Sequence, residues 1–356
     1  MAGDDLADPW SAFDGHEQVV LGFDEATGMR AIVAIHSTAL GPALGGTRMS
    51  TYAHTSAPMV AAYTDALRLA RAMSLKNALA GLPHGGGKGV LIGDPQRKSR
   101  DVLLAYGRFL QSLGGRYVTA GDVGMSVEDM DVIGETCTWT TGRSVERGGV
   151  GDSGQLTAVG VHLGMRAAAE YVWGDPTLDG KRVGIVGAGK VGGRLARHLA
   201  AENATVFIVD PSPQAAAWVG KEVPDATMVT DLDALLAMDL DVLSPNAMGG
   251  FITPELAEHL SVRLICGGAN NQLASPEVGD LLHARGITYA PDFMVNCGGV
   301  IQVAEELQGA DLDRAAARVA NVFETTPAVL ARAGQEGITP VVAAEREALD
   351  RISAGR

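Results

Sequence analysis

The stretch from Lys181 to Ser212 reads "KRVGIVGAGKVGGRLARHLAAENATVFIVDPS". A short apolar run leads into the pattern GxGxxG, formed by Gly187, Gly189 and Gly192, and a helical pattern follows. The first glycine of this pattern permits a tight turn, the second lets the backbone approach a pyrophosphate, and the third lets the helix pack on the strand. The free N–H groups of the helix N-terminus then face the phosphates. The stretch predicts a dinucleotide site; a glycine-rich turn that binds no cofactor is the alternative.

An acidic residue ends the next apolar run, TVFIVD, roughly twenty residues after the glycines. An aspartate at this place, here Asp210, bonds the ribose 2′-hydroxyl and repels a 2′-phosphate. Pro211 and Ser212 follow, so no arginine is at hand to hold such a phosphate. The sequence therefore predicts NAD rather than NADP.

From Lys181 onward, short apolar runs alternate with helical patterns. This alternation is typical of βαβ units and a parallel sheet. Before it, EQVVLGFDEATGMRAIVAIHS predicts two strands around the turn EATG. The glycine-rich stretch GRSVERGGVGDSGQLTA between the two regions indicates a boundary or hinge. The fold class predicted is α/β with two domains.

The segment APMVAAYTDALRLARAMSLKNALAG predicts an amphipathic helix, because apolar residues recur at helical spacing. The residues of this expected buried stripe are Met59, Val60, Tyr63, Leu67, Ala70 and Met73.

Composition excludes several classes of protein. The chain has 356 residues, with 46% hydrophobic and 20% charged residues, as in soluble globular proteins. A formal net charge of -14 argues against nucleic acid or an anionic membrane as partner. The three cysteines show no CxxC pairing, so we expect no disulfide framework, no metal site and a reducing, cytoplasmic location. The N-terminal MAGDDLADPW lacks an apolar core, which predicts no signal peptide, and no apolar run is long enough to span a membrane.

A second glycine run, GLPHGGGKGVLIGDP from Gly81 to Pro95, ends in Lys88. The phosphate-binding P-loop also needs a glycine six places before the lysine and Ser or Thr after it. Leu82 and Gly89 occupy those places, so this interpretation fails. Two interpretations of the glycine run remain. It is either a turn with a solvated lysine, or a set of glycines that let a backbone or ligand approach the residue beside them.

A nicotinamide cofactor needs a hydride donor beside it. Lys76, Lys88 and Asp122 are candidates to bind this hydride-donating substrate. One lysine can stay charged and bind a carboxylate. The other, its pKa lowered by burial and a neighbouring cation, can act as a general base. Asp122 can move a proton. His84 is either a partner of Lys88 or a plain loop histidine.

Six motifs in the same order resemble the amino-acid dehydrogenases that include glutamate, leucine, phenylalanine and valine dehydrogenases. The likeness runs from about Glu17 to about Ala344 and is greatest to the valine and leucine members. The motifs are GPALGGTRM (41–49), AMSLKNALAGL (72–82), LPHGGGKGVLIGDP (82–95), TAGDVG (119–124), GGANNQLA (267–274) and YAPDFMVNCGGVIQVAEEL (289–307).

The resemblance implies a role for each candidate. Lys76 matches the lysine that binds the substrate α-carboxylate, Lys88 the lysine that activates water, and Asp122 the aspartate that exchanges protons with the amine. The implied reaction converts an L-amino acid, NAD⁺ and water to a 2-oxo acid, ammonia and NADH. The family forms homo-oligomers.

The resemblance also implies the remaining site residues and the domains. The substrate set is Leu44, Gly45, Gly46, Met73, Lys76, Ala120, Asn270, Val300 and Val303. The cofactor set is Thr157, Gly187, Gly189, Lys190, Val191, Gly192, Asp210, Ala247, Asn270 and Asn271. An N-terminal α/β substrate and oligomerisation domain of residues 1–148 and 326–356 and a Rossmann domain of residues 149–325 are expected around a cleft.

Leu44 and Val303 stand where glutamate-specific members carry lysine and serine, and an unpaired buried γ-carboxylate would be costly. Ala120, Val300 and Val303 match the aliphatic pocket of the leucine and valine enzymes. We therefore expect a branched-chain substrate: valine, leucine or isoleucine. The alternatives are the same reaction on phenylalanine or tryptophan, and a non-catalytic NAD-binding regulatory protein.

Two residues depart from the family pattern. Asn246 stands where a cysteine is common, near the expected nicotinamide site. Cys297 replaces an alanine, and we expect a buried small residue there rather than a reactive thiol.

Overall fold

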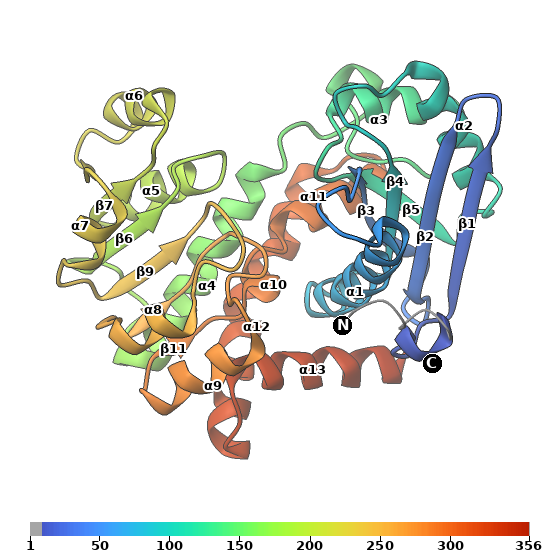
Figure 1. The fold of residues 1–356 in the computed structure, drawn as a ribbon. Helices are drawn as coiled ribbons and strands as arrows, with labels where there is room; N and C mark the ends of the chain where they lie inside the picture. The colour runs from blue at the N-terminus through green and yellow to red at the C-terminus, as the bar shows by residue number, and fades with distance from the viewer. Residues whose placement is uncertain (1–8, 356) are drawn as a thin grey trace. The chain divides into compact units, whose positions relative to one another are not determined.

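The computed structural model describes residues 9–355. Residues 1–8, which carry most of the segment used to predict the absence of a signal peptide, lie outside it. The chain forms two compact units (Figure 1). The first contains the described residues up to Gly151, Val300–Arg314 and the described residues from Ala348 on; the second contains Asp152–Gly299 and Ala315–Glu347. The expected domain limits at 148 and 326 stay a prediction, since compact packing alone does not define a functional domain.

The first unit is built on a mixed five-stranded sheet with the order β1-β2-β4-β3-β5. β1 pairs antiparallel with β2, and β2 with β4, whereas β3 runs parallel to both β4 and β5. The predicted hairpin around EATG is confirmed as β1 and β2. The strands are β1 (Gln18–Asp24), β2 (Met29–Ser37), β3 (Ala43–Ser50), β4 (Gly85–Ile92) and β5 (Tyr117–Gly121).

Helices cover both faces of this sheet. Alternate residues of β2 pack to opposite sides: Ile32 and Ala34 join a core with the small residues of α1, whereas Val33 and Ile35 join a core with α2 and α3. The helices are α1 (Pro58–Leu79), α2 (Arg100–Gln111) and α3 (Val127–Ile133).

The helix predicted for α1 is confirmed, but its buried stripe is wrong in part. Met59 is 49% exposed, and Val60, Tyr63 and Met73 are only partly buried. The face that packs on the sheet includes small and polar residues, because the helix approaches a glycine-rich strand closely and large side chains would not fit. The buried residues are Ala62, Ala66, Leu67, Leu69, Ala70, Ser74, Leu75, Asn77, Ala78 and Leu79.

The second unit has a six-stranded sheet in the order β11-β10-β9-β6-β7-β8, with every pair parallel. This confirms the predicted α/β class with a parallel sheet. The chain leaves β6 toward β7 on one side and later returns to β9 on the other, so the strand order reverses at β6. The strands are β6 (Arg182–Val186), β7 (Thr205–Val209), β8 (Thr227–Met228), β9 (Val242–Pro245), β10 (Leu264–Ile265) and β11 (Thr288–Tyr289).

Helices connect these strands and complete the chain. They are α4 (Gly154–Trp173), α5 (Gly192–Ala201), α6 (Pro213–Glu222), α7 (Leu232–Leu236), α8 (Pro254–His259), α9 (Pro276–Ala284), α10 (Asp292–Val295), α11 (Gly298–Glu306), α12 (Leu312–Glu336) and α13 (Pro340–Ala354). The last three each carry the chain from one unit to the other. Among residues 9–355, no helix is both long and apolar enough to cross a membrane.

Candidate functional site

The glycine run before Lys88 lies inside strand β4, not in a turn. Lys88 itself is only 5% exposed, which excludes the solvated lysine. The glycines are needed for close approach: a Cβ on Gly86 would meet the backbone nitrogen of Ser74 at 2.0 Å, and one on Gly89 would meet the hydroxyl of Tyr106 at 2.3 Å. Because side chains alternate along a strand, Lys88 faces away from Tyr106, toward the α1 side of the sheet.

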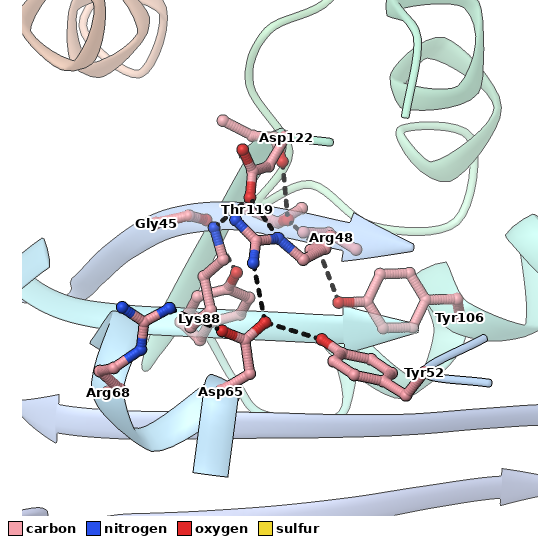
Figure 2. A network of polar contacts seen from close by, with 12 residues as sticks. Gly45, Arg48, Tyr52, Asp65, Arg68, Lys88, Tyr106, Thr119 and Asp122 are labelled. Atoms are coloured by element: carbon pink, nitrogen blue, oxygen red, sulfur yellow. Dashed lines mark hydrogen bonds and ion pairs between the residues drawn. The ribbon is translucent and has the colours of Figure 1, made fainter. Parts of the chain in front are cut away.

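Lys88 pairs with Asp122, which follows β5. The Lys88 Nζ lies 2.5 Å from Asp122 Oδ2 (Figure 2). Burial lowers the pKa of Lys88 below its ordinary value; Asp122 opposes this, and the cation of Arg48 adds to the lowering. Burial alone would raise the pKa of Asp122, but Lys88 and Arg48 outweigh it and hold that pKa below its usual range. The pair therefore combines two different groups: a lysine that can lose its proton, and a carboxylate that stays ionised.

Sequence reasoning missed the groups behind this pair. Arg48 of β3 places its Nε 3.3 Å from Asp122 Oδ2 and its Nη1 2.8 Å from Asp65 Oδ2. The hydroxyl of Tyr52 donates to the same Asp65 oxygen at 2.8 Å (Figure 2). An acidic residue between Ala62, Ala66 and Leu69 on the buried face of α1 was the signal that could have pointed to Asp65.

The expected substrate residues of β3 and α1 gather beside the pair. Leu44 is fully buried. A Cβ on Gly45 would lie 3.2 Å from Met73 Cγ, and one on Gly46 would lie 2.9 Å from Asp122 Cβ. Gly46 is the β-sheet partner of Ala120. Positions 45 and 46 both need glycine because the neighbours approach closely: a Cβ on Gly45 would also meet the carbonyl oxygen of Gly87 at 1.8 Å.

The other expected substrate residues divide between the units. Lys76, in the last turn of α1, and the partly buried Val300 and Val303 of α11 belong to the first unit, as do Lys88 and Asp122. Asn270 belongs to the second unit.

Glu306 of α11 is a further residue that the sequence did not single out. Its carboxylate accepts backbone N–H groups from Gly142 at 2.8 Å, Arg143 at 3.4 Å and Val150 at 3.1 Å. Burial raises its pKa, although these hydrogen bonds oppose the shift. Glu306 thus fastens the segment that precedes the second unit.

The GxGxxG loop joins β6 to α5 as predicted. Gly187 has φ of 95°, and a Cβ there would lie 2.8 Å from Ala247 Cβ. A Cβ on Gly192 would lie 1.9 Å from the carbonyl oxygen of Gly187. By contrast, nothing lies within 4 Å of the place where a Cβ of Gly189 would be. Two glycines therefore serve the turn and its packing, and the middle one leaves open space.

Asp210 lies at the end of β7 against this loop. Its Oδ2 accepts the Ala188 N–H at 2.7 Å, and its Oδ1 accepts the Ser212 N–H at 2.8 Å. Residues after β6, β7 and β9 thus meet at the carboxyl ends of the strands, beside the point where the strand order reverses. Ligands of open α/β sheets bind at this place.

Asn246 and Ala247 follow β9 on the other side of the reversal point. The Asn246 side chain donates to the Ser244 carbonyl at 2.9 Å and accepts the Gly268 N–H at 2.9 Å. The departure from the family pattern therefore has a structural use: the amide links two loops at the strand ends.

Buried amides that sequence reasoning missed hold the asparagine motif. Asn296 donates to Asn270 Oδ1 at 2.8 Å, and Gln272 donates to the carbonyls of Gly267 and Ala269. Asn271 takes the left-handed conformation, with φ of 52°.

The remaining cofactor candidates also lie in the second unit. Thr157 of α4 is buried and donates to the Ser153 carbonyl at 2.9 Å. Lys190 is exposed, with its Nζ 4.0 Å from Asp152, and Val191 is partly buried at the start of α5.

Two further residues from the sequence, His84 and Cys297, are both buried. His84 is buried and its Nδ1 lies 3.1 Å from the Pro42 carbonyl oxygen, so it braces the loop before β3. Cys297 is 1% exposed, as expected of a small buried residue.

Comparison with known proteins agrees with this arrangement. The family "Glu/Leu/Phe/Val dehydrogenase, dimerisation domain" matches residues 16–139, and "Glutamate/Leucine/Phenylalanine/Valine dehydrogenase" matches residues 213–353. The NAD-binding domain of D-isomer specific 2-hydroxyacid dehydrogenases matches residues 165–247.

Individual relatives resemble nearly the whole chain. Valine dehydrogenase of Streptomyces albus is 54% identical over 96% of this chain and 93% of its own. Leucine dehydrogenase of Bacillus subtilis is 44% identical over 95% and 91%. The crystal structure of L-tryptophan dehydrogenase from Nostoc punctiforme superposes with a TM-score of 0.84 at 36% identity, covering 96% of this chain and 97% of the other.

Proposed function

The chain belongs to the Glu/Leu/Phe/Val dehydrogenase family, and on that premise we propose that it oxidatively deaminates branched-chain L-amino acids with NAD. The observation that carries the proposal is the pairing of buried Lys88 with partly buried Asp122 beside the glycines of β3. Loss of either residue would favour a non-catalytic protein on the same scaffold, and both are present.

The pair suits the chemistry of the first unit. Lys76 stays charged and binds the substrate α-carboxylate. Asp122, ionised, accepts a proton from the substrate amine and returns it to the leaving ammonia. Lys88, once neutral, takes a proton from the water that attacks the iminium carbon. The buried surroundings lower the pKa of Lys88 and so favour its neutral form.

The second unit fits a dinucleotide. Open space at Gly189 lets the pyrophosphate approach the backbone, and the α5 N-terminus offers N–H groups to it. Asp210 has its carboxylate at the loop, where it can bond the ribose hydroxyls of NAD and would repel the 2′-phosphate of NADP. The bound NAD⁺ supplies the acceptor for the hydride that leaves the substrate Cα. Thr157 and the asparagine motif are proposed to hold the nicotinamide end.

We propose that an aliphatic pocket receives the side chain of the branched-chain substrate. Leu44, fully buried, offers no charge to a γ-carboxylate. Ala120, Val300 and Val303 are proposed to contact the side chain of valine, leucine or isoleucine. One methylene changes the transition-state energy by about 1–3 kcal/mol, so kcat/KM for these three substrates should differ by no more than about 10- to 200-fold. The 54% identity with a valine dehydrogenase supports the same choice.

We also propose a homo-oligomer, since residues 16–139 match a family domain described as a dimerisation domain. A cytoplasmic location suits the three buried free thiols.

The deciding experiment measures NADH absorbance with purified protein, NAD⁺ and a set of amino acids at alkaline pH. The set is valine, leucine, isoleucine, phenylalanine, tryptophan and glutamate. The highest rates on the aliphatic set, abolished in Lys88→Ala, support the proposal. A preference for an aromatic substrate would overturn the pocket assignment but keep the mechanism. Binding of NAD without turnover of any substrate would favour a regulatory protein.

A further inference from the structure

Arg48 connects the Lys88–Asp122 pair to a second carboxylate on α1. Its Nε reaches the same oxygen, Asp122 Oδ2, that Lys88 contacts, and its Nη1 reaches Asp65 Oδ2. The Asp65 side chain is 12% exposed and the Arg48 side chain 25% exposed, so the contacts are only partly open to water. The charges therefore alternate along a chain from Lys88 to Asp65 (Figure 2).

The far end of this chain is itself held in place. The hydroxyl of Tyr52 donates to Asp65 Oδ2, while the exposed Arg68 contacts the other oxygen, Oδ1, at 3.1 Å. Tyr52 adopts φ of 52°, a left-handed conformation that is strained for a bulky residue and persists only where other contacts impose it. A strained residue whose hydroxyl bonds Asp65 indicates that the position of this carboxylate matters.

The arrangement solves a problem that the reaction creates. Each turnover requires Lys88 to pass through its neutral form, and without Arg48 the partly buried Asp122 carboxylate would then have no cation beside it, which is costly. Arg48 keeps its charge at every working pH. It can therefore compensate Asp122 when Lys88 is neutral, while Asp65 compensates Arg48.

We infer that Arg48, anchored by Asp65, is a positioning residue that holds the Asp122 carboxylate against Lys88 in both charge states of the lysine. The inference rests on the proposed function and extends it to residues that touch no substrate. Arginine suits the task better than lysine, because its planar fork reaches two carboxylates from one side chain.

The charged groups that act on Lys88 come from three places: Arg48 on β3, Asp65 on α1 and Asp122 after β5. Removing the cation of Arg48 leaves Asp122 as the dominant neighbour, which favours the protonated lysine. The acid limb of the pH–rate profile should then move to higher pH.

The test compares Arg48→Gln, Arg48→Lys and Asp65→Asn with the wild type in NADH formation from valine. We expect Arg48→Gln to lower kcat roughly 100-fold, with a smaller change in KM, and to shift the acid limb upward. Arg48→Lys should keep the acid limb of the pH–rate profile at the wild-type pH but should recover only part of the wild-type kcat. Asp65→Asn should lower kcat roughly 10-fold with Arg48 still present. Arg97→Gln, which removes a cation that is 87% exposed, is the control and should behave as the wild type.

The outcome that overturns the inference is a folded Arg48→Gln protein with the kcat and acid limb of the wild type. If Arg48→Gln fails to fold, as judged by thermal unfolding, the other two variants decide, and wild-type kinetics in both would overturn it. A second readout does not depend on turnover: the pH at which Lys88 reacts with acetic anhydride, followed by peptide mass spectrometry. The pH at which Lys88 becomes reactive should be higher in Arg48→Gln than in the wild type, and an unchanged value would contradict the inference. This readout remains valid even if the wild type deaminates no amino acid and the proposed function fails.

Discussion

Gly86 of β4 lies against Ser74 of α1 with no room for a side chain between them. A Cβ on Gly86 would come within 2.0 Å of the Ser74 backbone nitrogen and 2.3 Å of its Oγ. Lys88 lies two residues further along the strand, and Lys76 two residues further along the helix. This contact sets how closely β4 and α1 pack, and each of these two elements carries one of the candidate lysines.

Gly86→Ala should destabilise the first unit and disable the site. The added methyl group meets backbone, which cannot rotate away, so we expect a loss of roughly 1–3 kcal/mol in stability. The displaced helix should lower kcat/KM more than 10-fold. Thermal unfolding and NADH formation measure the two effects. Gly220→Ala, where nothing lies within 4 Å, is the matched control; equal behaviour of the two variants would contradict the tight contact.

Oxidative deamination should depend on the deprotonation of Lys88. Burial lowers the lysine pKa, with Arg48 assisting, so the rate should rise with pH to a plateau below the ordinary lysine pKa of about 10.4. Lys88→Arg keeps the positive charge but cannot supply a base, and should lower kcat roughly 10²–10⁴-fold. The rise of the rate with pH should also be absent in this variant. The measurement is a pH profile of kcat/KM for both proteins. A wild-type limb that persists in Lys88→Arg would assign the titration to another group.

A buried histidine should make the first unit acid-sensitive. His36 is 5% exposed; its Nε2 donates to the Asp14 carbonyl, and its Nδ1 lies 2.8 Å from Ser74 Oγ. Burial, with help from nearby His16, lowers the His36 pKa from 6.5 to about 4. The unfolded chain therefore binds the proton more tightly, and stability is lost as pH falls from about 6.5 toward 4.

Between pH 7 and pH 5 this histidine should lower the stability by about 2 kcal/mol. His36→Gln should reduce the fall of the melting temperature over this range by roughly 4–8 °C. Part of the fall should remain, because burial also lowers the pKa of His162 in the second unit to about 4. His259→Gln, at an exposed position, is the control. An unchanged pH dependence in His36→Gln would show that the buried ring does not titrate with unfolding.

The sequence predicts well those features that depend on neighbouring residues. The GxGxxG loop, its helix and Asp210 follow one another along the chain, so their spacing carries the geometry. Lys88 and Asp122 were found because each lies in a motif of its own.

The features that were missed depend on contacts between distant segments. Arg48 lies inside a quoted motif, yet its use appears only when Asp65 of α1 is brought to it. Glu306 accepts N–H groups from residues more than 150 positions earlier in the chain. The buried face of α1 was misjudged because the partner strand is glycine-rich, so small and polar residues replace the large apolar ones that periodicity looks for.

Asp210 should set the preference for NAD over NADP. Replacing it with serine removes one ionised acceptor for the ribose hydroxyls and the charge that repels a 2′-phosphate. A hydrogen bond to a charged group contributes about 1.5–3 kcal/mol, so KM for NAD should rise roughly 10- to 100-fold, while NADP should become a better cofactor. Initial rates with both cofactors test this. Asp239→Ser removes an exposed carboxylate of the same unit and serves as control. A kinetic preference left unchanged in Asp210→Ser would contradict the assignment.

The size of the residues at 120 and 300 should exclude aromatic substrates. Ala120 is 8% exposed and pairs with Gly46 in the sheet, next to Asp122, while Val300 lies partly buried at the start of α11. The double variant Ala120→Gly with Val300→Ala removes three carbon atoms from the proposed pocket. Since each methylene contributes about 1–3 kcal/mol to discrimination, the ratio of kcat/KM for phenylalanine to that for valine should rise at least 10-fold. The same truncation at the exposed Val342, Val342→Ala, should leave the ratio unchanged. If the double variant loses activity on both substrates in equal proportion, these residues support the fold of the site but do not choose its substrate.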